Sequence, residues 1–139
     1  MEKPASEVLH ELLEKIRQRP QIYIGEKSLI KLRHFLDGAA CALYSEDDAD
    51  SGGFLKGFQE WIQLKYGITS TQHWSTIIRF SSFTDAQAFD LFFKNLDEFN
   101  SLDLHERSYE TLLQKNEAML KAMHKYNQRL KEIMNSENS

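Results

Sequence analysis

The sequence has 139 residues, of which 41% are hydrophobic and 27% are charged, and these proportions are typical of one globular domain rather than of a disordered chain. Two prolines and six glycines are few, so long helices meet few intrinsic breakers. No run approaches the roughly 18 consecutive apolar residues of a membrane-spanning helix, and the net charge of −4 is not the concentrated positive charge of a general nucleic-acid binder.

The start of the chain and its single cysteine bear on the cellular compartment. Charged residues recur throughout residues 1–16, which therefore lack the apolar core of a secretory signal peptide. Cys41 has no second cysteine to pair with, and its neighbours Ala40 and Ala42 favour a buried, unreactive thiol. We expect a cytoplasmic protein without disulfides.

Helical spacing of apolar residues dominates the first part of the chain. The first helix is predicted to begin with Ser6 as its N-cap and to end just before Pro20, which disfavours helical geometry in the preceding residue. Residues 21–25 are predicted to form an extended connector, and Ser28 to cap a second helix. Gly38 lies inside that helix, where we expect close packing against a neighbour to compensate for its low helix propensity.

The middle of the chain predicts a loop and three more helices. Residues 46–53 combine acids with turn formers and are predicted to be a surface loop. Residues 54–67 predict a third helix closed by glycine, and residues 74–80 predict a short helix, although their β-branched residues also suit a strand. Thr84 or Ser82 is predicted to cap the next helix. One face of that helix carries Phe89, Phe92, Phe93, Leu96 and Phe99.

The C-terminal segment has the most regular pattern, a heptad repeat with spacings of three and four residues. Its members are Tyr109, Leu112, Asn116, Met119, Met123, Tyr126, Leu130 and Ile133. Such a helix either packs along the bundle or pairs with a second copy, in which case Asn116 sets the register. We favour packing on the bundle, because heptad spacing is common wherever antiparallel helices pack. The predicted fold is all-α: a single-domain helical bundle over residues 1–134 with a long C-terminal helix, followed by a frayed tail over 135–139.

Residues that carry chemistry are scattered along the chain. The five histidines show no metal-binding spacing, and one cysteine cannot complete a structural zinc site. A glycine-rich phosphate loop and a Gly-x-Ser-x-Gly elbow are both missing. Neighbouring carboxylates such as Asp97 and Glu98 would diverge on a helix, whereas acid–base catalysis needs them to converge. We therefore expect a protein that is not an enzyme, with no catalytic, metal-binding or cofactor-binding residues.

Two motifs in the first half of the chain resemble those of a known group of proteins. Residues 19–25 fit the pattern Arg-Pro-x-x-Tyr-x-Gly, and residues 28–38 fit Ser-Leu-x-x-Leu-x-x-Phe-x-x-Gly. Together with Trp74 and the Gly-Phe-x-x-Trp run at residues 57–61, they resemble small helical bacterial immunity proteins of toxin-immunity systems, including contact-dependent growth inhibition. The resemblance covers roughly residues 12–100 and implies a protein that binds and neutralises a cognate toxin domain by blocking its active site.

Charge adds a prediction about that toxin. Residues 1–104 carry 11 Lys and Arg against 16 Asp and Glu, a net of −5. An acidic inhibitor complements the cationic cleft of a nuclease, so we expect a nuclease toxin of the RNase type. The predicted contacts lie in the acidic loop, at Glu46, Asp47, Asp48 and Asp50. The alternative is a helical adaptor or regulatory protein that dimerises through its C-terminal heptads. We expect neither membrane nor direct nucleic-acid binding, and a basic cluster within residues 17–33 leaves nucleic-acid binding as the least favoured reading.

Overall fold

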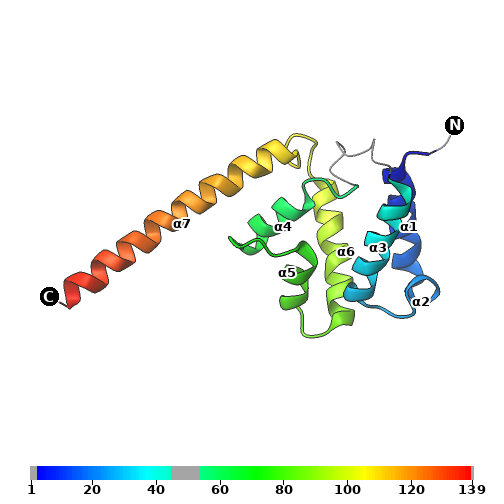
Figure 1. The fold of residues 1–139 in the computed structure, drawn as a ribbon, viewed down its shortest axis with the longest axis horizontal. Helices are drawn as coiled ribbons and strands as arrows, with labels where there is room; N and C mark the ends of the chain where they lie inside the picture. Colours follow the sequence, from blue (N-terminus) through cyan, green and yellow to red (C-terminus); the bar gives the residue numbers. More distant parts are fainter. Residues whose placement is uncertain (1–2, 45–53, 139) are drawn as a thin grey trace.

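The computed structural model of the chain describes residues 3–44 and 54–138, and these residues contain helices and no strand. The helices are α1 (Ala5–Gln18), α2 (Pro20–Tyr23), α3 (Leu29–Leu43), α4 (Phe58–Tyr66), α5 (Trp74–Phe80), α6 (Asp85–Ser101) and α7 (Tyr109–Glu137). Figure 1 shows α1 to α6 gathered into one bundle, from which α7 extends outward. The predicted all-α, single-domain bundle with a long C-terminal helix is confirmed.

The core is organised around α6, which packs against α3, α4 and α5. Its predicted phenylalanine face is buried as expected. Phe58 of α4 lies at the centre of an aromatic cluster and is fully buried. Its ring centroid lies between 5.5 and 6.1 Å from those of Trp61, Trp74, Phe92 and Phe99. Such edge-to-face and tilted contacts bury large apolar surfaces in specific geometry, so this cluster fixes how α4, α5 and α6 meet.

The corner between α1 and α3 differs from the prediction of an extended connector. The first helix does end before Pro20, and Arg19 has the non-helical angles φ −138° and ψ 66°. Pro20 then begins a helical turn, α2, in which Ile24 N–H donates to the Pro20 carbonyl over 2.9 Å. The reason is that proline, which cannot continue a helix, suits its first position, where no N–H is needed.

The start of α1 also differs from the prediction. The helix begins at Ala5, one residue before Ser6, and no side chain caps it. The carbonyl of Pro4 accepts from the backbone N–H of Glu7 and of Val8 instead. Ser6 therefore lies inside the first turn and does not act as the N-cap.

Ser28 caps α3 as predicted and also joins it to α6. Its hydroxyl oxygen accepts from Lys31 N–H over 3.0 Å and donates to the carboxylate of Asp85. The same carboxylate accepts from the backbone N–H of Leu29 over 2.9 Å and of Ile30 over 3.2 Å. One carboxylate of α6 thus satisfies the N-terminus of α3, where helices leave N–H groups unpaired and favour negative charge. Asp85 holds the first turns of the two helices together.

The helices α4 and α5 depend on local features at their ends. Residues 54–57 are a turn rather than helix, because Gly57 has φ +86° and α4 begins after it. Gly67 closes α4 in the left-handed conformation, as predicted. The predicted helix over residues 74–80 is confirmed, and His73 caps it through Nδ1, which accepts from Ser75 N–H over 3.1 Å. Burial, with a smaller contribution from Arg33, lowers the pKa of His73 below its ordinary value of 6.5.

Two predictions for α3 are wrong. Cys41 is exposed, although its alanine neighbours suggested a buried thiol. The buried face of α3 is defined by Leu29, Leu32 and Leu36, and a residue five positions after Leu36 points well away from that face. Gly38 also lies on the open side of the helix, where an added Cβ would meet no atom within 4 Å. Close packing therefore does not explain this glycine.

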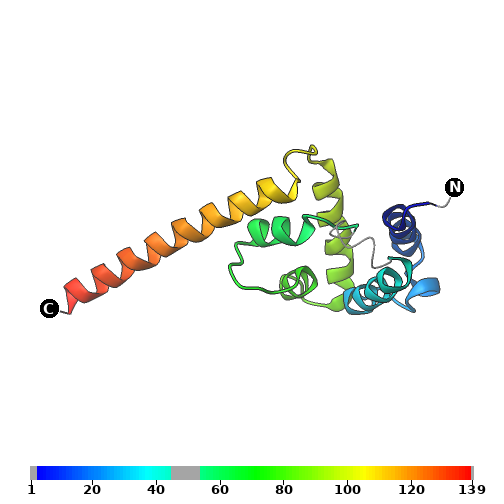
Figure 2. The ribbon, with the colours of Figure 1, turned by 45° about the horizontal axis from the view of Figure 1, so that its top comes forward.

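The path of α7 is the largest departure from the prediction. Its first turns pack on α4, with Leu112 buried, and after Met119 each described residue of the helix is exposed. Figures 1 and 2 show from two directions that the helix leaves the bundle instead of lying along it. Our preference for packing along the bundle is thus wrong for residues 120–137. No helix among the described residues is long and apolar enough to cross a membrane.

Candidate protein-binding surfaces

The acidic loop predicted to contact a toxin, Glu46, Asp47, Asp48 and Asp50, lies outside the described residues. Acids elsewhere on the bundle are often paired with bases. Arg17 donates both guanidinium nitrogens to Asp97, over 2.9 and 2.7 Å, and this hydrogen bonding lowers the pKa of that carboxyl against the opposing effect of burial. Lys27 pairs with Asp90 over 3.1 Å. Such pairs balance part of the negative charge of the bundle locally, which reduces its field at a distance.

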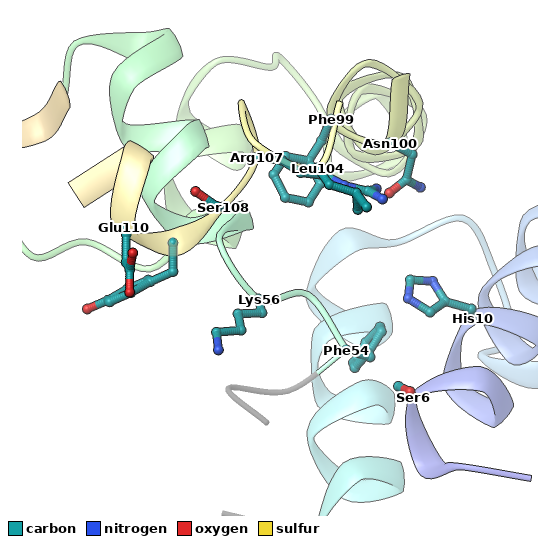
Figure 3. A pocket seen from close by; sticks show the side chains of 11 residues that line it. Ser6, His10, Phe54, Lys56, Phe99, Asn100, Leu104, Arg107, Ser108 and Glu110 are labelled. Carbon is teal, nitrogen blue, oxygen red and sulfur yellow. The ribbon is translucent and has the colours of Figure 1, made fainter. Parts of the chain in front are cut away.

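An open hollow of about 570 Å³ lies between α1, the turn before α4 and the start of α7. His10 packs edge-to-face on Phe54 at its rim, with ring centroids 5.5 Å apart. Figure 3 shows the hollow from close by, with Glu110 and His10 on opposite sides and Arg107 beside Phe99. Ser6 and His10, one turn apart on α1, both line it, and no hydrogen bond joins these two side chains.

Metal-ligating side chains do not gather anywhere in residues 3–44 and 54–138: no group of three His, Cys, Asp or Glu is placed to hold a metal ion. Buried polar groups are instead structural. Asn95 of α6 is fully buried and accepts from Lys65 Nζ over 2.5 Å while donating to the Tyr66 hydroxyl over 3.0 Å. These contacts satisfy an amide that would otherwise be costly to bury.

Large apolar side chains are exposed at one end of the bundle. Phe80 at the end of α5 is 79% exposed, and Phe83 in the turn before α6 is 94% exposed. Ile30 of α3 lines the same shallow hollow of about 210 Å³ as Phe80, together with Arg33 and Arg79. We call these five residues the end patch. Aromatic and arginine side chains are the types enriched where proteins bind proteins.

The end patch is held in place by the junction between α3 and α6. Asp85, which accepts from Ile30 N–H, follows Phe83 by two residues. Arg79 donates to the carbonyl of Ser82 over 3.2 Å, and Ser82 donates back to the carbonyl of Ile78 over 3.0 Å. The turn that exposes Phe80 and Phe83 is therefore fixed by hydrogen bonds on both sides, and a fixed apolar surface loses little entropy on binding.

A second exposed apolar surface runs along α7. Its members share one side of the helix and are between 40% and 64% exposed. They are Leu120, Met123, Tyr126, Leu130, Ile133 and Met134, and we call them the free stripe. Asn116, expected to set the register of a dimer, is not part of it, because its amide faces α4 with Nδ2 3.5 Å from the Glu60 carbonyl.

Sequence reasoning anticipated one of these surfaces only in part. Four members of the free stripe belong to the predicted heptads, whereas Leu120 and Met134 do not, and spacing alone did not show whether the bundle covers them. The end patch was missed. The sequence holds one indication of it: Phe80 and Phe83 lie on either side of two serines, in the short stretch where α5 ends and before α6 begins. An aromatic residue there does not belong to the apolar face of either helix. No family model, curated protein or solved structure matches the chain.

Proposed function

We propose that this chain is a non-catalytic binding protein that neutralises a cognate bacterial toxin domain, and that the end patch is its contact surface. The observation that carries the proposal is the exposure of Phe80 and Phe83 on a turn fixed by hydrogen bonds. Two phenylalanines cost free energy when left in water, and binding hot spots combine such side chains with arginine, here Arg33 and Arg79. A partner that covers them recovers that free energy.

The resemblance to immunity proteins supports the choice of a toxin as partner. The residues that carry it are structural in this chain: Pro20 starts α2, and Ser28 caps α3 and donates to Asp85. That junction also holds the turn that bears Phe83. Thus the motif residues build the platform for the end patch, which is the role expected of a motif shared by proteins that bind different partners.

The proposal that the toxin is a nuclease follows from the negative charge of this chain and concerns the acidic loop rather than the end patch. A nuclease cleft is cationic, and Glu46, Asp47, Asp48 and Asp50 would complement it. The end patch carries arginines and would instead contact an apolar or acidic part of the toxin outside the cleft. The two surfaces make separate predictions, so variants can tell them apart.

The test is co-expression with the toxin encoded beside this chain, with cell survival and complex formation as readouts. Phe83→Asp should abolish protection, whereas Leu104→Asp, at an exposed leucine outside the patch, should leave it intact. Replacing Asp47, Asp48 and Asp50 together by Asn tests the acidic loop. If the natural chain fails to protect, toxin neutralisation is refuted; if Phe83→Asp protects and the triple variant does not, the loop and not the end patch is the contact.

The second candidate function is an adaptor that dimerises through α7, and the free stripe is the observation that favours it. A monomeric soluble protein rarely leaves so long an apolar surface in water. An adaptor of this kind should hold two partner molecules per two copies of the chain, which light scattering of the complex measures. A complex with one copy of each protein would refute it.

A further inference from the structure

We infer that the free stripe of α7 is covered by the same stripe of a second copy, with the two helices antiparallel. This inference rests on the second candidate function and names its geometry. The available surface is defined by how α7 leaves the bundle: Leu112 and Asn116 are used against α4, and from residue 120 onward the heptads continue without a partner in the described part of the chain. The free segment 120–137 is about 27 Å long at 1.5 Å per residue.

The stripe is complementary to itself when one helix is reversed. In heptad terms Met123 and Leu130 occupy a positions, and Tyr126 and Ile133 occupy d positions. An antiparallel pair sets a against d, so Met123 can lie against Ile133 of the second copy while Tyr126 lies against Leu130. In this register the helix of the second copy ends at the point where the first helix enters its own bundle, so the whole free segment is used.

Asn127 selects this register among the antiparallel ones. It is the polar residue among the e positions of the free segment, seven residues from Leu120 on one side and seven from Met134 on the other. In the register described above, Leu120 lies against Met134 of the second copy, and Asn127 lies against Asn127 of the second copy. An amide both donates and accepts, so two facing asparagines satisfy each other. A shift by one heptad would set Asn127 against Leu120 or Met134 and leave the amide unpaired at a cost.

A parallel pair fits the flanking residues less well. There, e positions face g positions of the partner, so Met134 would lie beside Arg129, and Leu120 beside Lys115, which already belongs to the part of α7 on the bundle. The antiparallel pair instead keeps the apolar e residues together. On the opposite edge of the antiparallel pair, Arg129 lies near Arg129 of the second copy. Residues 119–137 carry four Lys and Arg against two Glu, a net of +2 per helix. Association should therefore strengthen as salt rises, because salt screens this repulsion.

The area is sufficient for a specific but modest interface. A buried Leu, Ile or Met side chain removes roughly 60–120 Å² from water, so six stripe residues bury about 500 Å² per helix and about 1,000 Å² per pair. This reaches the lower limit of specific interfaces, and we expect a dissociation constant of about 1–10 µM. In Figure 1 the turn between α5 and α6 lies at the far end of α6 from the start of α7, so the end patch and the free stripe are separate surfaces.

The first test measures mass against concentration by sedimentation equilibrium with the full chain. We expect a shift from 16.3 kDa toward twice that value as concentration rises through about 1–10 µM. Leu130→Glu should weaken association by at least about 100-fold, because it buries a charge in the seam. Gln128→Glu introduces the same charge on the polar side of the helix, two residues away, and should change it little. Both residues lie in the free segment, so the bundle formed by α1 to α6 should unfold at the same urea concentration in both variants.

The second test measures orientation with cysteines, in a chain in which the exposed Cys41 is replaced by Ser. Asn127→Cys should form a disulfide with its own copy, and Leu120→Cys mixed with Met134→Cys should cross-link although neither does so alone. Met123→Cys should not pair with itself, because its two copies lie about 15 Å apart along the seam. A Met123 cross-link without one at Asn127 would overturn the antiparallel geometry.

Two results would overturn the second copy as the occupant. One is a mass of 16.3 kDa at every concentration up to about 100 µM. The other is equal association of Leu130→Glu and the natural chain. Binding of a monomeric chain to vesicles of anionic phospholipid, lost in Leu130→Glu, would assign the stripe to a membrane surface instead. Each of these results leaves the toxin test through Phe83 unaffected, so failure of the dimer and failure of toxin neutralisation are distinguishable.

Discussion

Removing the carboxylate of Asp85 should destabilise the fold far more than removing an ordinary surface acid. That carboxylate accepts from the Ser28 hydroxyl and from the N–H groups of Leu29 and Ile30. Ser28 and Leu29 are buried, so water cannot replace the lost acceptor there, while Ile30 is exposed and water can. Two unreplaced bonds to a charged acceptor are worth about 1.5–3 kcal/mol each and are not fully additive. We expect Asp85→Ala to lower the free energy of unfolding by about 2–4 kcal/mol.

The assay is urea denaturation followed by circular dichroism at neutral pH. At an m-value of about 2 kcal/mol/M the midpoint should fall by about 1–2 M. Asp85→Asn keeps one oxygen acceptor and should lose about half as much. The matched control is Asp90→Ala, which removes an exposed pair with Lys27 and should cost less than about 0.5 kcal/mol. If Asp85→Ala proves no more harmful than Asp90→Ala, the junction between α3 and α6 does not hold the bundle as argued.

Three further predictions concern stability. Phe58→Ala should cost about 3–5 kcal/mol by denaturant titration, because Phe58 is the centre of the aromatic cluster; a loss below about 1 kcal/mol would contradict that role. Gly57→Ala should cost about 1–3 kcal/mol more than Gly25→Ala, since both glycines have φ near +87° but only at Gly57 would the new Cβ lie 2.8 Å from a backbone oxygen; equal costs would refute the clash. The pKa of His73 is lowered in the folded state, so as the pH falls the unfolded chain binds a proton before the folded one does. The free energy of unfolding should therefore fall as the pH drops below the ordinary value of 6.5, whereas above that pH His73 does not affect it. Urea titrations at pH of about 7.5 and about 5 should show a smaller loss in His73→Asn, which keeps a capping acceptor, and the same loss as the natural chain in the exposed-site control His105→Asn.

Features that depend on neighbouring residues in the sequence were predictable. Ser28 and Thr84 each precede a helix and cap it, and Gly67 closes α4, because capping involves only atoms within four residues. The phenylalanine face of α6 was equally predictable, since a wide apolar face at helical spacing has to be buried somewhere. Local chemistry decides such features before any tertiary contact forms.

Features that depend on what lies opposite a residue were not predictable. Apolar neighbours do not show which side of α3 faces the core, so Cys41 was assigned to the wrong side. Pro20 marked the end of α1 correctly, but proline both ends one helix and starts another, and only the packing of the corner selects the helical turn. The end patch depends on Asp85 meeting Ser28 across 57 residues, a contact that no spacing rule contains. The acidic loop lies outside the described residues, so its predicted role as a toxin contact stays a prediction.

The exposed path of α7 means that folding of its last turns is coupled to association. Most helices in proteins owe their stability to tertiary packing. An unpacked helical segment of about 18 residues in water is therefore marginal, even when it continues from packed turns of the same helix. Residues 120–137 should therefore exchange their amide hydrogens quickly in dilute solution and become protected as the concentration rises, whereas amides of α6 should exchange slowly at any concentration. The length of ordered α7 would then increase with the concentration of the protein. The two bundles of a dimer would be held at a fixed separation only when both α7 helices are fully formed.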